Sequence, residues 1–180
     1  MQREPHDARI ASDLKMLEFK VEPLTRELID EMFPLQEQYW QDVAAPFHQF
    51  PPDVDWETYL KAQALNRLIV ITARNETGRL VGGVAVVLGP HPHYACLSAS
   101  LPLLFLDPKY RGGLDGARLV WRAEKEAEQA GAQLMITHGG MHNGVYRLFE
   151  GMKYQDFGRY FVKVLPNGPH GTEPVFKEKK

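Results

Sequence analysis

The sequence predicts an α/β domain whose mixed, mostly antiparallel β-sheet is covered by helices on both faces. Three observations support this prediction. Residues 25–66 show mainly helical periodicity, and two β-branched runs at 68–73 and 80–88 flank a turn sequence. Between 95 and 137, an apolar run, an amphipathic stretch and a second apolar run follow one another, as in a right-handed parallel crossover.

The first half of the chain is expected to supply one short strand and several helical segments. Residues 19–21 form a β-like run, and Thr25 has the side chain of a helix N-cap. Pro34 lacks a backbone N–H, so we expect it to break or kink this helix and to open a second piece over 35–43. After a proline-rich loop, residues 55–66 are expected to form a helix with an aspartate at its N-cap.

The second half is expected to supply the rest of the sheet and two helices. Asn75-Glu-Thr-Gly78 has the turn chemistry of a hairpin between the two β-branched runs. Gly131 is expected to end the amphipathic helix, because glycine readily adopts the left-handed conformation found there. The elements after the hairpin are a strand, a helix, a strand, a helix and a closing strand, at 95–106, 116–129, 134–137, 143–152 and 157–165.

Composition indicates one soluble domain, with residues 1–17 and 167–180 as tails around a domain at 18–166. A formal net charge of −2, with basic residues spread along the chain, disfavours a nucleic-acid partner. No window has the length and apolarity of a membrane span, so we expect no membrane partner. The single cysteine, Cys96, cannot form an internal disulfide, which favours a reducing, cytoplasmic location.

A glycine-rich turn lies between a strong predicted strand and a strong predicted helix, and it contains Arg111, Gly112, Gly113 and Gly116. Glycines let backbone N–H groups turn toward a ligand, and the helix N-terminus adds partial positive charge, which together favour anion binding. Tight turns also favour glycine, so the loop alone leaves a purely structural interpretation open. The Lys-Ser/Thr pair of a P-loop is absent, and a dinucleotide fingerprint would follow the first strand of a βαβ unit.

Residues 106–119, Leu-Asp-Pro-Lys-Tyr-Arg-Gly-Gly-Leu-Asp-Gly-Ala-Arg-Leu, resemble the acyl-CoA motif of the GNAT N-acetyltransferases. That motif is a hydrophobic–x–Pro strand end followed by Arg-x-x-Gly-x-Gly/Ala. The resemblance extends in element order over about residues 19–165. His91-Pro-His-Tyr94 together with Tyr110-Arg-Gly-Gly113 is further similar to GNAT relatives carried by phages and prophages.

The resemblance implies a GNAT-type sheet of six to seven strands that splays between the strands at 95–106 and 133–137. It also implies acetyl-CoA as co-substrate, no metal, and direct acetyl transfer to an amine on a small molecule or a protein. In the family, the pantetheine arm lies in the splay and backbone amides after the arginine hold the pyrophosphate. Carried over, the cofactor-binding residues are Phe105, Leu106, Arg111, Gly112, Gly113, Leu114, Asp115, Gly116, Ala117, Asn143 and Phe149.

Three residues depart from the family pattern. Leu114 stands at the first motif glycine, and Asp115 brings a negative charge beside the expected pyrophosphate. Phe149 has no hydroxyl at the position where a Leu-Tyr-x-x-x-Gly-Phe motif supplies the tyrosine that protonates the leaving thiolate. These departures favour a second hypothesis, a catalytically degenerate GNAT-fold protein that serves in binding or interaction. Pro102, inside the long apolar strand, is expected to sit at a β-bulge.

His138, at the end of a strand beside the expected splay, is the candidate general base, because histidine accepts a proton near neutral pH. Tyr146, one helical turn before Phe149, is the candidate acid. A capped, solvent-facing histidine and a packed tyrosine remain open interpretations. Zinc is not expected at His91-x-His93, since no cysteine or acidic cluster lies nearby. The acceptor-binding candidates are Trp40, His48, His93 and Tyr94, and the closing strand offers a homodimer contact.

Overall fold

The computed structural model describes residues 17–43, 53–139, 144–158 and 161. The elements of this part of the chain follow the order that the periodicity predicts, except around Pro34 and at the expected closing strand. The elements are β1 (Glu18–Val21), α1 (Arg26–Val43), α2 (Trp56–Ala64), β2 (Leu68–Arg74), β3 (Leu80–His91), β4 (Cys96–Leu106), η2 (Pro108–Tyr110), α3 (Asp115–Gln129), β5 (Leu134–Ile136) and α4 (Val145–Gly151).

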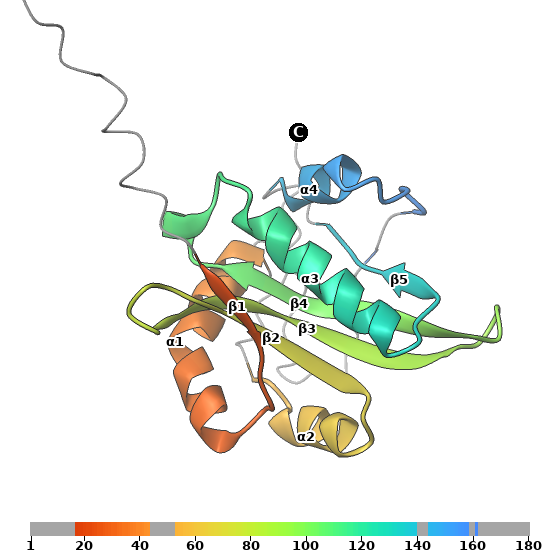
Figure 1. Ribbon diagram of the computed structural model, residues 1–180, viewed down its shortest axis with the longest axis horizontal. Helices are drawn as coiled ribbons and strands as arrows, with labels where there is room; N and C mark the ends of the chain where they lie inside the picture. The colour runs from red at the N-terminus through yellow and green to blue at the C-terminus, as the bar shows by residue number, and fades with distance from the viewer. Residues whose placement is uncertain (1–16, 44–52, 140–143, 159–160, 162–180) are drawn as a thin grey trace, which may run out of the picture.

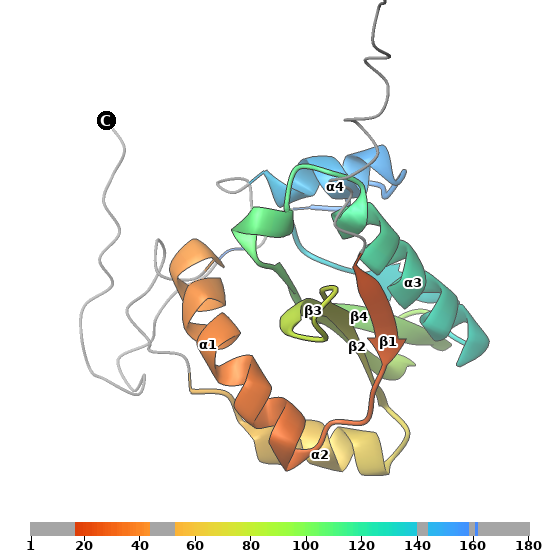
Figure 2. The same ribbon diagram turned by 60° about the vertical axis from the view of Figure 1, so that its left-hand side comes forward.

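The strands form one sheet in the order β1-β2-β3-β4-β5, antiparallel throughout except for the parallel pair β4–β5. Figures 1 and 2 show α3 on one face of this sheet and α1 and α2 on the other. Leu119 and Ala123 of α3 pack on the first face, while Leu28 and Ile29 of α1 pack on the second. The predicted fold class, a mixed and mostly antiparallel sheet with helices on both faces, is confirmed.

Local side-chain chemistry sets the helix starts and the hairpin. The backbone N–H of Leu28 donates to Thr25 Oγ1 at 3.2 Å, and that of Thr58 donates to Asp55 Oδ1 at 3.0 Å. Both predicted N-caps are therefore confirmed. In the β2–β3 turn, Asn75 Oδ1 accepts from the backbone N–H groups two and four residues further on, which closes the predicted hairpin.

The expected break at Pro34 is wrong, because α1 runs without interruption from Arg26 to Val43. Pro34 lies on the exposed side of the helix, where its ring displaces nothing in the core. Another side of the helix faces the sheet: Leu28 is buried there, and Leu35 packs against the same cluster about two turns later. Burial of a continuous apolar face thus outweighs the loss of one helical hydrogen bond.

The described sheet has five strands, fewer than the six to seven that the family resemblance implies. The expected closing strand at 157–165 falls largely outside the described residues, and its described members, Phe157, Gly158 and Phe161, are not in a strand. Within the described ranges, none of the helices is both long enough and apolar enough to cross a membrane.

Candidate cofactor and acceptor site

The strands β4 and β5 pair over only three residues before they separate. The pairing begins at Ser98 with Leu134 and ends at Ser100 with Ile136. Beyond Ser100, β4 continues to Leu106, and among the described residues no strand covers the edge of β4 that faces away from β3. The sheet therefore opens at Ser100, as the splay expected between these two strands requires.

A β-bulge lies at the same place on the other edge of β4. Ser100 pairs with Val87 and Leu103 pairs with Ala85, so Leu101 and Pro102 together oppose a single residue of β3. Pro102 can occupy the strand because the extra residue of a bulge leaves the ladder locally disrupted and a donor unneeded. The expected bulge is present, and it adjoins the opening of the sheet.

The loop that follows β4 is held in place by side chains around it. Asp107 caps η2 by accepting from the N–H of Lys109 at 2.9 Å, and Asn75 Nδ2 donates to the Tyr110 hydroxyl at 3.2 Å. Gly112 then adopts a φ of +91°, which favours glycine. A Cβ added at Gly112 or Gly113 would meet nothing within 4 Å, so the space above this turn is open.

The backbone N–H groups from Gly112 to Ala117 have no acceptor among the described residues. They precede or begin α3, whose N-terminus adds partial positive charge. The side chain of Leu114 is 77% exposed and does not close over the turn. Asp115 is paired with Arg118 at 2.8 Å, which partly neutralises the carboxylate that the sequence places here. This arrangement can hold an anion of the size of a diphosphate.

The fourth helix forms the next wall of this loop. Figures 1 and 2 show α4 beside the N-terminal end of α3. A Cβ on Gly116 would lie 3.7 Å from Leu148 Cδ2, an ordinary van der Waals separation. The loop is therefore bounded by α4 on the side that continues into the opening between β4 and β5.

The side chain of Arg111 turns away from the loop toward α1 and the end of β4. Its Nε donates to the carbonyl oxygen of Leu106, and its Nη2 lies 2.7 Å from Asp42 Oδ2. The guanidinium carbon lies 5.1 Å from the centre of the Phe105 ring, against whose edge Tyr39 packs at 6.1 Å. Arg111 thus joins the end of α1 to the end of β4.

Trp40, a candidate for acceptor binding, follows Tyr39 in α1. Its Nε1–H is buried and has no acceptor among the described residues. A buried donor without a partner is costly in a folded protein, so this indole is suited to donate to an incoming oxygen. His48 lies outside the described residues.

The candidate base and acid belong to two segments that meet where β5 leads into α4. His138 is exposed and follows the end of β5 by two residues. An added Cβ on Gly139 would lie 2.8 Å from Tyr146 Cα, so the chain after His138 packs directly on the start of α4. The Tyr146 hydroxyl accepts a hydrogen bond from Arg147 Nε at 3.1 Å, which raises the pKa of the arginine. Asn143 lies outside the described residues.

Phe149 is buried inside the contact between α4 and β5. Its ring centre lies 5.2 Å from that of Tyr154, whose hydroxyl donates to Met135 Sδ at 3.0 Å. Burial, together with the nearby carboxylate of Glu124, raises the pKa of Tyr154 well above its usual range. Phe149 therefore fills an apolar position, and its ring offers no proton.

His93 and Tyr94 lie at the opposite end of β4 from Phe105. They belong to the turn between β3 and β4, where the ring of His91 stacks on Tyr94 at 4.4 Å. Phe105, near the other end of β4, contacts Tyr39 of α1. An extended strand spans roughly 30 Å from the start of β4 to Phe105. Arg111 thus contacts α1, the helix that contains Trp40, whereas the turn between β3 and β4 lies at the far end of the sheet from that contact (Figure 1).

One hollow that the sequence analysis did not identify lies under α2, beside the bulge. Its volume is about 310 Å³. Four of its lining residues, Asp55, Thr58, Tyr59 and Ala62, recur at helical spacing in α2 and its N-cap. This spacing is the sequence signal that indicates a shared face of the helix. The hollow is lined by Asp55, Thr58, Tyr59, Ala62, Val87, Ser100 and Pro102.

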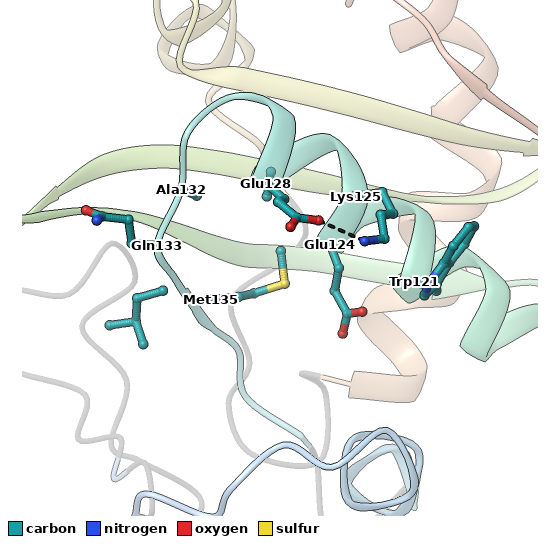
Figure 3. A pocket seen from close by; sticks show the side chains of 9 residues that line it. Trp121, Glu124, Lys125, Glu128, Ala132, Gln133 and Met135 are labelled. Carbon is teal, nitrogen blue, oxygen red and sulfur yellow. Dashed lines mark hydrogen bonds and ion pairs between the residues drawn. The ribbon is translucent and has the colours of Figure 1, made fainter.

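A second hollow of similar volume lies between the outer side of α3 and β5, and Figure 3 shows its lining. Trp121, Glu124 and Met135 contribute to its walls, and at its rim Lys125 and Glu128 form an ion pair at 2.8 Å. This second hollow lies along the second half of α3, whereas the glycine loop lies before the first residue of that helix. The two features are therefore separate.

Comparison with known proteins gives a consistent result. The family model described as "Acetyltransferase (GNAT) family" matches residues 27–152. An "IAA acetyltransferase" of Azospirillum brasilense is 31% identical over 105 residues, 57% of this chain and 62% of that relative, so the match spans less than two thirds of the relative's length.

Solved structures agree in fold. A predicted acetyltransferase from Clostridium acetobutylicum, determined with acetyl-CoA, has a TM-score of 0.66 at 15% identity and covers 86% of this chain and 100% of its own. An acetyltransferase of Trypanosoma brucei has a TM-score of 0.64 at 15% identity and covers 83% of this chain and 100% of its own.

Proposed function

Because this chain belongs to the GNAT acetyltransferase family, we propose that it is an acetyl-CoA-dependent N-acetyltransferase that acts directly on an amine. The observation that carries the proposal is the row of backbone N–H groups from Gly112 to Ala117, at the start of α3, that have no acceptor in the described part of the chain. These groups, the open space above the glycines and the helix N-terminus fit the pyrophosphate of acetyl-CoA.

The remaining parts of the cofactor fit the opening of the sheet. The pantetheine arm would lie along the uncovered edge of β4, reaching Phe105 and Leu106 near the loop. The thioester would then lie toward Ser100, where β4 and β5 separate. The residues proposed to bind acetyl-CoA are Phe105, Leu106, Arg111, Gly112, Gly113, Leu114, Asp115, Gly116, Ala117, Asn143 and Phe149.

In the proposed reaction, the neutral amine nitrogen attacks the thioester carbonyl carbon. A carbon–nitrogen bond forms, the carbon–sulfur bond breaks, and CoA leaves as a thiolate. His138 would take the proton from the amine, and Tyr146 would return one to the thiolate, so that an amide and CoA with a free thiol result. Arg147 Nε, which donates to the Tyr146 hydroxyl at 3.1 Å, would hold this hydroxyl in position.

Residues 18–166 are proposed as the catalytic domain, with tails at 1–17 and 167–180. Trp40 is proposed for the acceptor side, and its buried Nε1–H, which has no acceptor among the described residues, supports this role. His48, His93 and Tyr94 stay predictions for the acceptor side. A cytoplasmic location and a homodimer also remain predictions.

One observation favours a second function. Phe149 is buried and has no hydroxyl where the family motif has the proton-donating tyrosine. If Tyr146 does not replace it, the protein would bind acetyl-CoA without turning it over and would act as a binding or interaction module. Turnover, rather than binding, separates these two functions.

Calorimetric titration with acetyl-CoA tests the proposal. We expect binding in the micromolar range, and binding at least about 100-fold weaker for pantetheine, because pantetheine lacks the phosphates that the amides would hold. Leu114→Glu should weaken acetyl-CoA binding, since it places a negative charge at the exposed turn beside those phosphates. Release of the CoA thiol in the presence of amines measures turnover.

The matched control is Leu65→Glu, which places the same charge on another exposed leucine, at the end of α2. This variant should bind acetyl-CoA like the parent. Absence of any heat with high micromolar acetyl-CoA, or equal affinity for acetyl-CoA and pantetheine, would contradict the proposed site. Binding without thiol release from any amine would support the non-catalytic function instead.

A further inference from the structure

We propose that the hollow under α2 selects the acceptor, and that this acceptor is a small primary amine on an uncharged apolar body, without a carboxylate or a phosphate. The inference rests on the proposed function, because it names the substrate class of the same reaction. Its basis is the position, the wall and the charge of this hollow.

The hollow adjoins the point where the thioester would lie. Two of its lining residues lie at the bulge of β4: Pro102 is one of the two bulge residues, and Ser100 directly precedes them. Ser100 is also the last residue of β4 that pairs with β5, so the opening of the sheet begins there. An amine bound in the hollow would therefore present its nitrogen next to the place where β4 and β5 separate.

The wall of the hollow favours an apolar body. Tyr59, Ala62, Val87 and Pro102 supply carbon atoms from α2, β3 and β4. The Ser100 hydroxyl is turned to the carbonyl oxygen of Val87, at 3.4 Å. Burial of an uncharged aliphatic or aromatic group against this wall is favourable, whereas a sugar would lose the water that binds its hydroxyls.

The charge at the rim favours a cation. Asp55 has the single carboxylate among the seven lining residues, and none of the seven is lysine or arginine. Its carboxylate is fixed by Thr58, which donates from its N–H at 3.0 Å and from its hydroxyl at 2.6 Å. An approaching ammonium is attracted to this carboxylate, and a carboxylate or phosphate on the acceptor is repelled.

The test measures kcat/KM from CoA release for three amines: phenethylamine, phenylalanine and glucosamine 6-phosphate. Phenethylamine and phenylalanine share the same ring and amine, and only the second has a carboxylate. We expect kcat/KM to be at least about tenfold higher for phenethylamine than for either of the other two. Ala62→Leu, which fills the hollow, should lower the value for phenethylamine by about tenfold and leave the acetyl-CoA Kd unchanged.

A matched pair of variants tests the charge. Asp55→Asn removes the carboxylate but keeps an N-cap side chain, and it should reduce the preference for phenethylamine over phenylalanine by about threefold, since the group is exposed to solvent. Glu57→Gln removes an exposed carboxylate that does not line the hollow, and it should leave the preference unchanged.

The outcomes separate this inference from the proposed function. If acetyl-CoA binds and some amine is acetylated, but phenethylamine is no better than phenylalanine or Ala62→Leu has no effect, the assignment of the acceptor is wrong while the enzyme remains. If acetyl-CoA does not bind, the proposed function fails, and the acceptor assignment fails with it.

Discussion

Arg111 has an observed partner, Asp42, and a proposed one, the pyrophosphate of acetyl-CoA. The family motif places an arginine beside the pyrophosphate, whereas the guanidinium here is paired with Asp42 and lies over Phe105. The two paired side chains are 40% and 32% exposed, and ion pairs in such positions contribute about 0–1 kcal/mol. A bound pyrophosphate, with its greater negative charge, would therefore compete well for the same guanidinium.

Replacement of Arg111 by alanine should lower the affinity for acetyl-CoA by about 1.5–3 kcal/mol, the usual contribution of a hydrogen bond to a charged group. Asp42→Asn should leave that affinity unchanged or raise it, because the arginine loses a competing partner. Calorimetry on both variants measures the effect. An unchanged affinity in Arg111→Ala, with a lower free energy of unfolding, would show that the arginine only joins α1 to β4.

At the scale of elements, two helices end in the same way with different residues. α3 is followed by Gly131 at a φ of +89°, and α4 by Lys153 at a φ of +65°. In both, the next residue donates its N–H to a carbonyl five positions back: Ala132 to Ala127 and Tyr154 to Phe149, each at 2.9 Å. These are Schellman ends, which favour glycine at the left-handed position. Lys153 stands where the family motif Leu-Tyr-x-x-x-Gly-Phe has that glycine.

We expect Lys153→Gly to raise the free energy of unfolding by about 0.5–1 kcal/mol, because glycine adopts a positive φ without the steric cost of a Cβ. At the end of α3, Gly131→Ala should lower the free energy of unfolding by about 1–2 kcal/mol, because it adds a Cβ at a positive φ. Urea denaturation followed by circular dichroism measures both. A destabilised Lys153→Gly would mean that the lysine side chain contributes more than its backbone costs.

At the scale of the whole molecule, Arg74 joins three segments that are distant in sequence. Its guanidinium pairs with Glu22, just after β1, at 3.0 Å and with Glu31 of α1 at 2.6 Å. The arginine side chain is only 14% exposed, so both carboxylates face a charge that water screens little. Its hydrogen bond is the main cause that lowers the pKa of Glu22 below the ordinary value of 4.5.

This lowered pKa makes stability depend on pH in a definite direction. A carboxyl group whose pKa is lowered by folding stabilises the folded state at any pH above its ordinary pKa. This contribution is lost as the pH falls through the lowered pKa. The free energy of unfolding should therefore fall less between pH 7 and acid pH in Glu22→Gln than in the parent. Glu76→Gln, at an exposed turn position, should follow the parent curve. Parallel curves for the parent and Glu22→Gln would contradict this account.

The sequence by itself determined the order and kind of the elements, because the signals for them are short-range. Thr25 and Asp55 cap their helices through residues three positions away, and Gly131 ends α3 within one turn. The glycine turn before α3 was likewise visible in a few consecutive residues. Pro34 shows the limit of such signals, because packing of another face of the helix decided that α1 continues.

Only the tertiary structure decided which distant residues meet. Arg111 and Asp42 are 69 positions apart, and no local pattern indicates that they pair. The hollow under α2 likewise needs residues of α2 to meet Val87, Ser100 and Pro102 of the sheet, which are distant in sequence. Contacts of this kind follow from how the elements pack together, and packing depends on the shapes of all the buried side chains at once.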